Sequence, residues 1–231
     1  MRRVLVTRPR PDADRTAAMV RAAGHEALVH PLMRIETRAD ALAGAPDADA
    51  LAFTSANGVR AYAGAGGAPL PAYVVGPASA RAARAAGLPV AGVAEGDVDA
   101  LAALIADAAP GQVLHACGAA AGDLAGTLRA AGVPCARAVL YDAVAEAALP
   151  EAAARDIAAG VDWVVLHSPR SARLLVALVR EAGLAGTLTR ARLAALSPAV
   201  AAAAGDAFAE ARVAASPSSS ALVDFISAGD T

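Results

Sequence analysis

The sequence repeats itself, and the order of the repeated pieces limits the folds that this chain can adopt. A short piece at residues 4–24 resembles residues 113–132, and both end in Arg-Ala-Ala-Gly. A longer piece at residues 53–101 resembles residues 166–222. Alanine-rich sequences resemble one another by chance, but coincident serine, proline and glycine positions favour a duplication. The order along the chain is therefore short, long, short, long.

Short apolar runs alternate with alanine-rich helical stretches along the whole chain. One such stretch, residues 12–23, ends at Gly24, a typical helix terminator. Aromatic residues make up only 3% of the chain, so alanine, valine and leucine must build the core. The alternation is typical of α/β folds with parallel sheets covered by helices on both faces. Strands are predicted at residues 3–6, 27–30, 50–53, 73–75, 90–93, 113–115, 136–140, 163–167, 193–196 and 213–215.

The lengths of the connections indicate how the repeated pieces combine into domains. The first long piece runs into the second short piece through only Pro110-Gly111, a normal loop inside one domain. The links at residues 36–49 and 142–161 are much longer. We therefore expect two flavodoxin-like or Rossmann-like lobes, with a ligand site in the cleft between them. The predicted boundaries are 1–35 with 147–231 for one lobe, 38–140 for the other, and about 32–38 and 139–146 for two crossing strands.

Charge and composition exclude several classes of function. The formal net charge is −2, without the basic excess of nucleic-acid or membrane-surface proteins. The chain has no lysine, which rules out Schiff-base chemistry and a P-loop. No apolar run approaches the roughly 20 residues of a membrane span, and the first residues read as a strand instead of a signal peptide. A cytoplasmic monomer without nucleic-acid or membrane partners is expected.

No pattern in the sequence predicts a metal or a cofactor. The four histidines lack metal-ligand spacing, and the two cysteines, Cys117 and Cys135, form no C-x-x-C motif. The glycine fingerprint of dinucleotide-binding proteins is also missing. A cofactor-using α/β enzyme is therefore disfavoured.

The loops that follow the predicted strands carry the candidate binding residues. Each has a hydroxyl residue, glycine or proline just before a helix, and helix capping is the ordinary role of such residues. Together, helix starts on two facing rims would suit a ligand with several carboxylates. The candidates on these loops are Thr7, Arg8, Arg10, Thr54, Ser55, Gly76, Ser79, Ser168, Arg170 and Ser197.

Three side chains near the predicted cleft are candidates for acid–base chemistry. His115 and His167 end predicted buried strands, where a structural histidine is more common than a catalytic one. Tyr141 lies on a predicted crossing strand, so it is either a packing residue or a proton donor that faces the cleft.

Several short motifs, in order, resemble the uroporphyrinogen-III synthase family over nearly the whole chain. They begin at Val4-Leu5-Val6-Thr7-Arg8-Pro9 and include residues 52–59, 74–80, 139–144 and 166–171. The resemblance implies a two-domain fold without metal or cofactor, and the substrate hydroxymethylbilane, closed into a ring with one pyrrole inverted. It places the family's motif tyrosine on Tyr141 and its hydroxyls on Thr54, Ser55, Ser79 and Ser168.

The chain departs from the family pattern at two places. It reads Ser197-Pro198-Ala199-Val200 where relatives often have Gly-Pro and two hydroxyl residues, and Gly122-Asp123 where many have Gly-Arg. These departures put individual substrate contacts in doubt. The alternative function is a non-enzymatic two-lobed binding or sensor protein for a small polycarboxylate.

Overall fold

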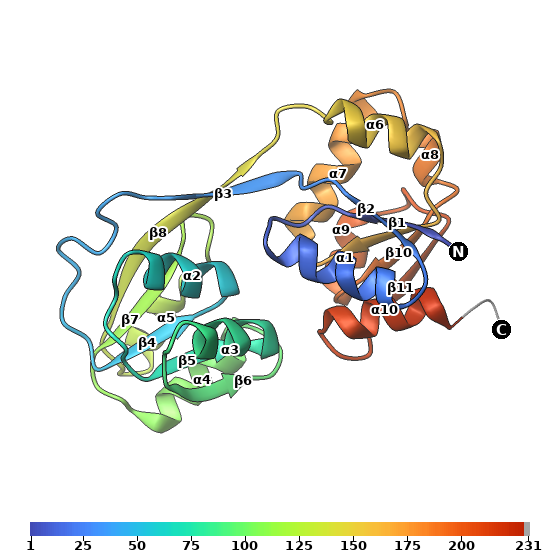
Figure 1. The fold of residues 1–231 in the computed structure, drawn as a ribbon. Helices are drawn as coiled ribbons and strands as arrows, with labels where there is room; N and C mark the ends of the chain where they lie inside the picture. Colours follow the sequence, from blue (N-terminus) through green and yellow to red (C-terminus); the bar gives the residue numbers. More distant parts are fainter. Residues whose placement is uncertain (229–231) are drawn as a thin grey trace. The chain divides into compact units, whose positions relative to one another are not determined.

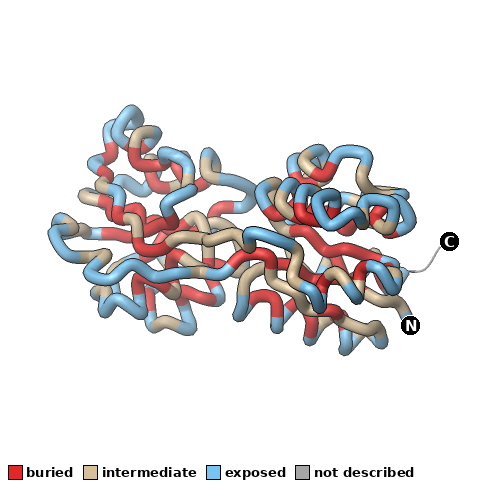
Figure 2. The backbone as a smooth tube through the Cα atoms, turned by 90° about the horizontal axis from the view of Figure 1, so that it is seen from above, coloured by how far each residue is buried: buried red, intermediate tan, exposed pale blue. Residues whose placement is uncertain are grey.

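The computed structural model describes residues 1–228, which form an α/β structure with two sheets (Figure 1). The chain divides into two compact units. Unit 1 comprises residues 1–34 and 144–231, and unit 2 comprises residues 35–143. Buried segments run through the interior of each unit, and exposed segments lie mainly on helices and loops (Figure 2). Among the described residues, no helix is long and apolar enough to cross a membrane.

Unit 1 is built around a five-stranded sheet with the order β11-β10-β9-β1-β2. Every pair of neighbouring strands in it is parallel. Its elements are β1 (Arg3–Val6), α1 (Asp12–Ala22), β2 (Glu26–Val29), α6 (Glu151–Ala158), β9 (Trp163–Leu166), α7 (Pro169–Glu181), α8 (Ala185–Leu188), β10 (Arg192–Ala195), α9 (Pro198–Ala204), β11 (Glu210–Val213) and α10 (Ser219–Ser227).

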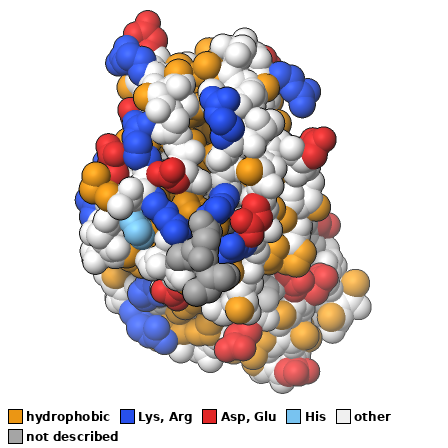
Figure 3. Space-filling view, turned by 90° about the vertical axis from the view of Figure 1, so that its right-hand side faces the viewer, with side chains coloured by type: hydrophobic (Ala, Val, Ile, Leu, Met, Phe, Trp, Pro, Cys, Tyr) orange, Lys and Arg blue, Asp and Glu red, His pale blue; other side chains and the backbone are white. Residues whose placement is uncertain are grey.

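Arginines line the amino ends of these strands, and most of them contact acidic residues. Figure 3 shows arginines beside carboxylates on one face of the molecule. Arg192 and Arg212 both pair with Glu210, and both guanidinium groups lie 5.7 Å from the ring centre of the buried Trp163. Arg3 pairs with Glu26 at 3.3 Å. These carboxylates offset part of the positive charge at this edge of the sheet.

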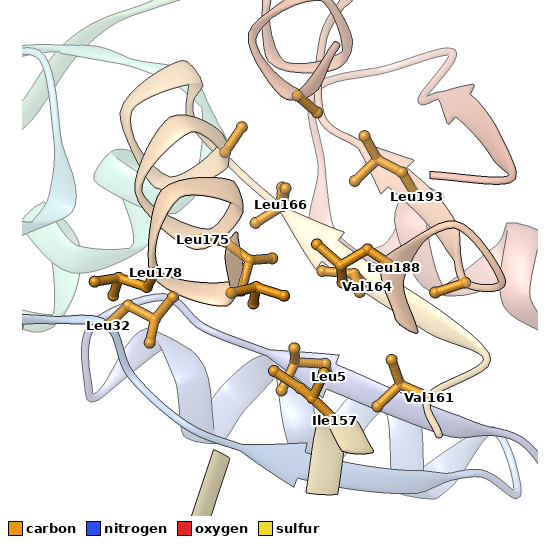
Figure 4. Packing of buried hydrophobic residues seen from close by; sticks show 14 of the residues in the cluster. Leu5, Leu32, Ile157, Val161, Val164, Leu166, Leu175, Leu178, Leu188 and Leu193 are labelled. Atoms are coloured by element: carbon orange, nitrogen blue, oxygen red, sulfur yellow. The ribbon is translucent and has the colours of Figure 1, made fainter. Parts of the chain in front are cut away.

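Both faces of the unit 1 sheet are covered by apolar side chains. Leu5 from β1, Leu166 from β9 and Leu175 from α7 belong to one cluster, which Figure 4 shows from close by. On the opposite face, Val20 of α1 and Leu222 of α10 pack in a second cluster with Val4 and Trp163. Short aliphatic side chains fill both layers, as the composition predicts.

Unit 2 has a six-stranded sheet with the order β3-β8-β7-β4-β5-β6. Phe53, Val59 and Tyr62 lie in the cluster on the α2–α3 face, and Leu101 and Leu128 lie in the cluster on the α4–α5 face. Its elements are β3 (Met33–Thr37), β4 (Ala50–Phe53), α2 (Ala56–Gly64), β5 (Ala72–Val75), α3 (Gly76–Ala85), β6 (Val90–Ala94), α4 (Val98–Ala108), β7 (Val113–Gly118), α5 (Leu124–Ala130) and β8 (Cys135–Ala145).

The strand orders of the two sheets match once the repeated pieces are aligned. Unit 1 reads β2-β1-β9-β10-β11, and unit 2 reads β8-β7-β4-β5-β6. In each case a β-α-β piece stands beside a three-strand piece, which is the flavodoxin-like order. The short and long repeats seen in the sequence therefore correspond to the two halves of each sheet.

The chain passes between the units at β3 and β8, which are neighbours in the six-stranded sheet. The N–H of Arg38 donates to the carbonyl of Leu140, and that of Glu146 donates to Leu32. Because these bonds pair rising residue numbers in one strand with falling numbers in the other, β3 and β8 run antiparallel. Crossing strands are predicted from the sequence at about 32–38 and 139–146. In the structure the second of these and the predicted strand 136–140 form one continuous strand, β8, which pairs with β3.

One predicted strand was misplaced. The apolar run at residues 213–215 suggested the last strand, but β11 spans Glu210–Val213. Its pairing with β10 begins at Arg192 and Glu210, whose side chains also form an ion pair at 3.4 Å. Interstrand pairing thus overrides the local apolar pattern at this sheet edge.

Candidate functional site

Both sheets reverse their strand order at one point, and the candidate residues cluster beyond those points. The reversal lies between β1 and β9 in unit 1, and between β7 and β4 in unit 2. In open α/β sheets, ligands bind outside the carboxyl ends of the strands at such a switch point. Arg8 and Ser168 follow the strands at the first switch point, and Ser55 and Gly118 lie at the second.

In unit 2, Tyr141 and Ser55 meet through their hydroxyl groups. The Tyr141 Oη and the Ser55 Oγ are 2.9 Å apart, although the two residues are 86 positions apart in the chain. Ser55 is the N-cap of α2, where its Oγ accepts a hydrogen bond from the Gly58 N–H at 3.2 Å. Tyr141 is only 9% exposed, so its ring packs in the core and only a small part of it reaches the surface.

Gly118 provides the surface against which the Tyr141 ring lies. A β-carbon at residue 118 would fall 2.6 Å from Cζ and 2.7 Å from Cε2 of the ring. Such distances are too short for any side chain, so the ring occupies this place only because residue 118 is a glycine. The pairing of β7 with β8 shifts register here and sets Gly118 opposite Tyr141.

Arg137 holds the loop that follows Gly118. Its Nη2 donates to the carbonyls of Ala119 at 2.9 Å and Ala121 at 3.3 Å. The N–H of Ala119 in turn donates to the carbonyl of Tyr141 at 3.0 Å. The loop and the tyrosine are therefore fixed to each other by backbone and side-chain bonds.

The remaining candidates of unit 2 do not belong to the Tyr141–Ser55 pair. Thr54 is partly buried at the end of β4. Gly76 begins α3 with a φ of 70°, a left-handed conformation that favours glycine. Ser79 is only 3% exposed inside α3. Its hydroxyl is therefore poorly placed to touch a ligand, contrary to the expectation from the sequence.

In unit 1, Arg8 belongs to a polar cluster that the sequence did not predict as a group. Its Nη1 donates to the Ser219 Oγ at 3.2 Å, and its Nη2 lies 3.5 Å from the Asp12 Oδ2. The His167 Nε2 is 2.9 Å from the same Ser219 oxygen. Burial, and then the charge of Arg8, hold the pKa of His167 well below its usual value. The neutral imidazole and the guanidinium thus meet at the start of α10.

Ser219 and Asp12 were not among the predicted site residues. The serine-rich loop before α10 was a visible signal, since residues 216–220 include four serines. Nothing in the local sequence shows which of these serines faces Arg8 and His167. That choice depends on how α10 packs against the sheet.

The other candidates of unit 1 differ in how far their side chains are exposed. Ser168 caps α7, where its Oγ accepts from the Ser171 N–H at 3.1 Å. Ser197 is partly buried at the start of α9 and makes no capping bond with its side chain. Thr7 is only 2% exposed, so its hydroxyl is also poorly placed for ligand contact. Arg10 and Arg170 are exposed, and Arg10 pairs with Asp14.

His115, a candidate from the sequence, lies inside the core. It was predicted to end its strand, but β7 continues to Gly118 and leaves His115 in the strand interior with no exposed surface. Neither ring nitrogen has a hydrogen-bond partner among residues 1–228. Burial, with a contribution from Arg137, lowers the pKa of His115 to about 4. His115 is therefore a neutral core residue with no access to a ligand.

The described residues contain no group of three or more His, Cys, Asp or Glu side chains that could hold a metal ion. Both cysteines are buried thiols. The chemistry available at the two switch points is thus that of hydroxyl groups, a phenol, a neutral imidazole, a guanidinium and helix-start amides.

Comparison with known proteins gives consistent results. The family model described as uroporphyrinogen-III synthase HemD matches residues 14–224. A uroporphyrinogen-III synthetase structure from Helicobacter pylori is 17% identical, with a TM-score of 0.64 and 98% of each chain covered. A mutant uroporphyrinogen III synthase structure from the extremely thermophilic bacterium Thermus thermophilus is 19% identical, with a TM-score of 0.60, covering 98% of this chain and 97% of that one. No curated protein sequence matches significantly.

Proposed function

This chain belongs to the uroporphyrinogen-III synthase family, and we propose that Tyr141 is the proton donor of its reaction. The family model covers residues 14–224, and this match carries the assignment. The enzyme is a cyclising lyase of haem biosynthesis. It closes the linear tetrapyrrole hydroxymethylbilane into uroporphyrinogen III, with the terminal pyrrole inverted. No observation favours a non-enzymatic binding protein.

In the proposed reaction, the Tyr141 O–H gives its proton to the departing hydroxyl while the carbon–oxygen bond breaks. Water leaves, and an electrophilic azafulvenium cation remains beside the Tyr141 phenolate. The already substituted carbon of the terminal pyrrole attacks it to form a spiro intermediate, which fragments and closes again with that ring inverted. The proton lost from the pyrrole carbon at the final closure restores the Tyr141 O–H, so the net change is the loss of one water molecule.

The main task of the protein in this scheme is orientation. Spontaneous closure without inversion competes with the enzymatic reaction, so the chain must be held with the normally disfavoured carbon nearest to the electrophile. One proton donor and a shaped binding surface suffice for such chemistry. The small number of ionisable side chains at the switch points supports this proposal.

We propose that helix-start amides bind much of the substrate's carboxylate charge. Ser55, Ser168 and Ser197 each stand at the N-terminus of a helix, where backbone N–H groups and the helix dipole favour anions. Arg8, Arg10, Arg170 and the Thr54 hydroxyl would assist at the edges. Thr7, Gly76 and Ser79 would shape their loops without side-chain contact to the substrate.

The first prediction concerns substrate affinity. Thr54→Ala and Ser168→Ala are each expected to cost about 1 kcal/mol, a few-fold in KM, because each removes one neutral hydrogen bond. Ser168→Pro, which also deletes an amide, should weaken binding more. Arg8→Ala, Arg10→Ala and Arg170→Ala should each remain within tenfold. A loss of three orders of magnitude in any single arginine variant would show that side-chain charge holds the substrate.

The second prediction concerns the product. Freshly made hydroxymethylbilane mixed with the purified protein is expected to give isomer III in excess over isomer I, the product of spontaneous closure. The two isomers are resolved by chromatography after oxidation to porphyrins, with heat-inactivated protein as the control. A product mixture identical to that control would contradict the enzymatic function.

We further propose that the enzyme acts as a cytoplasmic monomer without nucleic-acid or membrane partners. The net charge of −2, without a basic excess, supports the part of this proposal that concerns nucleic acid. Light scattering of the purified protein would report its mass.

A further inference from the structure

We infer that Ser55 acts through Tyr141 as a positioning residue and does not bind the substrate with its side chain. The inference rests on the proposed role of Tyr141. It concerns the 2.9 Å contact between the Ser55 Oγ and the Tyr141 Oη.

The direction of this hydrogen bond follows from the helix cap. The Ser55 Oγ already accepts a bond from the Gly58 N–H at 3.2 Å, since Ser55 is the N-cap of α2. A hydroxyl that accepts a bond becomes a better donor, because hydrogen bonds in a chain polarise one another. We therefore assign the order Gly58 N–H to Ser55 Oγ, and Ser55 O–H to Tyr141 Oη.

This direction matters for proton transfer. When the phenol gives its proton to the departing hydroxyl, negative charge develops on the Tyr141 oxygen. A hydrogen bond donated to that oxygen stabilises the charge, and such charge-assisted bonds are stronger than neutral ones. The first turn of α2 adds the favourable end of a helix dipole behind Ser55. Ser55 thus lowers the barrier of the step without touching the substrate.

Gly118 holds the phenol from the other side. A β-carbon there would lie 3.0 Å from the Tyr141 oxygen and closer still to the ring carbons. The φ of Gly118 is not in the left-handed region, so alanine strains only this contact. The phenol is therefore located by a hydroxyl from α2 and by the backbone of β7.

The test is a double-mutant cycle on turnover. Ser55→Ala is expected to lower kcat about tenfold with KM within twofold, because the lost interaction exists mainly in the transition state. In the Tyr141→Phe background, Ser55→Ala should have no further effect on kcat. Ser55→Thr, which keeps the hydroxyl, should restore most of the activity. Gly118→Ala should lower kcat as well, because it displaces the phenol from Ser55.

The matched control is Asp97→Ala. Asp97 caps α4 of the same unit by accepting from the N–H groups of Asp99 and Ala100, so its loss has a similar effect on stability without any contact to Tyr141. Circular dichroism should first show that the Asp97→Ala and Ser55→Ala variants are both folded. The kcat of Asp97→Ala should then equal that of the unmodified enzyme.

Two results would overturn the inference about Ser55. Both can be distinguished from a result that contradicts the proposed role of Tyr141. A rise in KM at constant kcat in Ser55→Ala would make Ser55 a substrate-binding residue. An effect that multiplies with Tyr141→Phe would show that the two side chains act independently. If Tyr141→Phe itself left kcat unchanged, the proposed proton donor would be wrong, whatever Ser55→Ala did.

Discussion

Tyr141→Phe is expected to lower turnover about 100-fold, which is the lower end of the contribution of a general acid. The substitution removes only the hydroxyl and leaves the ring, which packs against Gly118 and lies in the apolar cluster of α2 and α3. Substrate affinity should therefore change little. The measurement is the initial rate of isomer III formation, corrected for spontaneous closure to isomer I.

Tyr62→Phe is a suitable control for the loss of a tyrosine hydroxyl in the same unit. The Tyr62 hydroxyl donates to the carbonyl of Ala68 at 3.0 Å, and its ring lies in the same apolar cluster as Tyr141. Its replacement should reduce stability slightly and leave turnover unchanged. Unchanged turnover in a folded Tyr141→Phe variant would instead identify Tyr141 as a packing residue.

The stability of the protein should fall as the pH is lowered from about 6.5 to about 4, because of His115. Burial holds its pKa at about 4 in the folded protein, against an ordinary value of 6.5. In this window the unfolded chain binds a proton that the folded chain does not, so acid favours unfolding. The difference corresponds to about 3 kcal/mol of unfolding free energy, which is fully lost near pH 4.

His115→Leu is expected to remove this part of the pH dependence and to stabilise the protein at pH 7. The variant eliminates two buried ring nitrogens that have no hydrogen-bond partner in the described part of the chain, and each costs about 1–3 kcal/mol when unsatisfied. Urea unfolding at several pH values measures the effect. His167, whose pKa is also lowered, should leave a residual dependence.

Asp142→Asn provides the contrast. Arg38 donates two hydrogen bonds to the Asp142 carboxylate and lowers its pKa below 3.8, so this pair loses its contribution only in more acidic solution. The loss of unfolding free energy between pH 6.5 and 4 should therefore be the same in Asp142→Asn as in the unmodified protein. A pH dependence in that window that survives His115→Leu unchanged would contradict the role given to His115.

The order of the elements could be predicted because its signals are local. Glycine and proline punctuate the chain, and a short apolar run such as Ala50–Phe53 forms a strand that is buried on both faces. The internal repeat added the pairing of short with long pieces, and the strand orders of the two sheets match when those pieces are aligned. The family followed from motifs that are contiguous in sequence, and the match over residues 14–224 confirms it.

Errors arose where pairing between distant segments decides the outcome. The end of β7 was placed at His115, but its partner strand β8 continues the ladder to Gly118 and buries the histidine. The last strand was shifted because β10 selects its register. The apolar pattern of one segment does not show where a strand ends or which register it takes, because a ladder continues as far as both partner strands remain extended.

By itself, the sequence determined the α/β class, the duplicated order of strands and the family, because these depend on periodicity and short motifs. It also marked Tyr141, Ser55 and Arg8 as candidates one by one. Only the tertiary structure decided which of them meet: Tyr141 with Ser55 against Gly118, and Arg8 with His167 through Ser219. The physical reason is that hydrogen bonds act over about 3 Å, whereas these partners are brought together by strand register and helix packing across long stretches of chain.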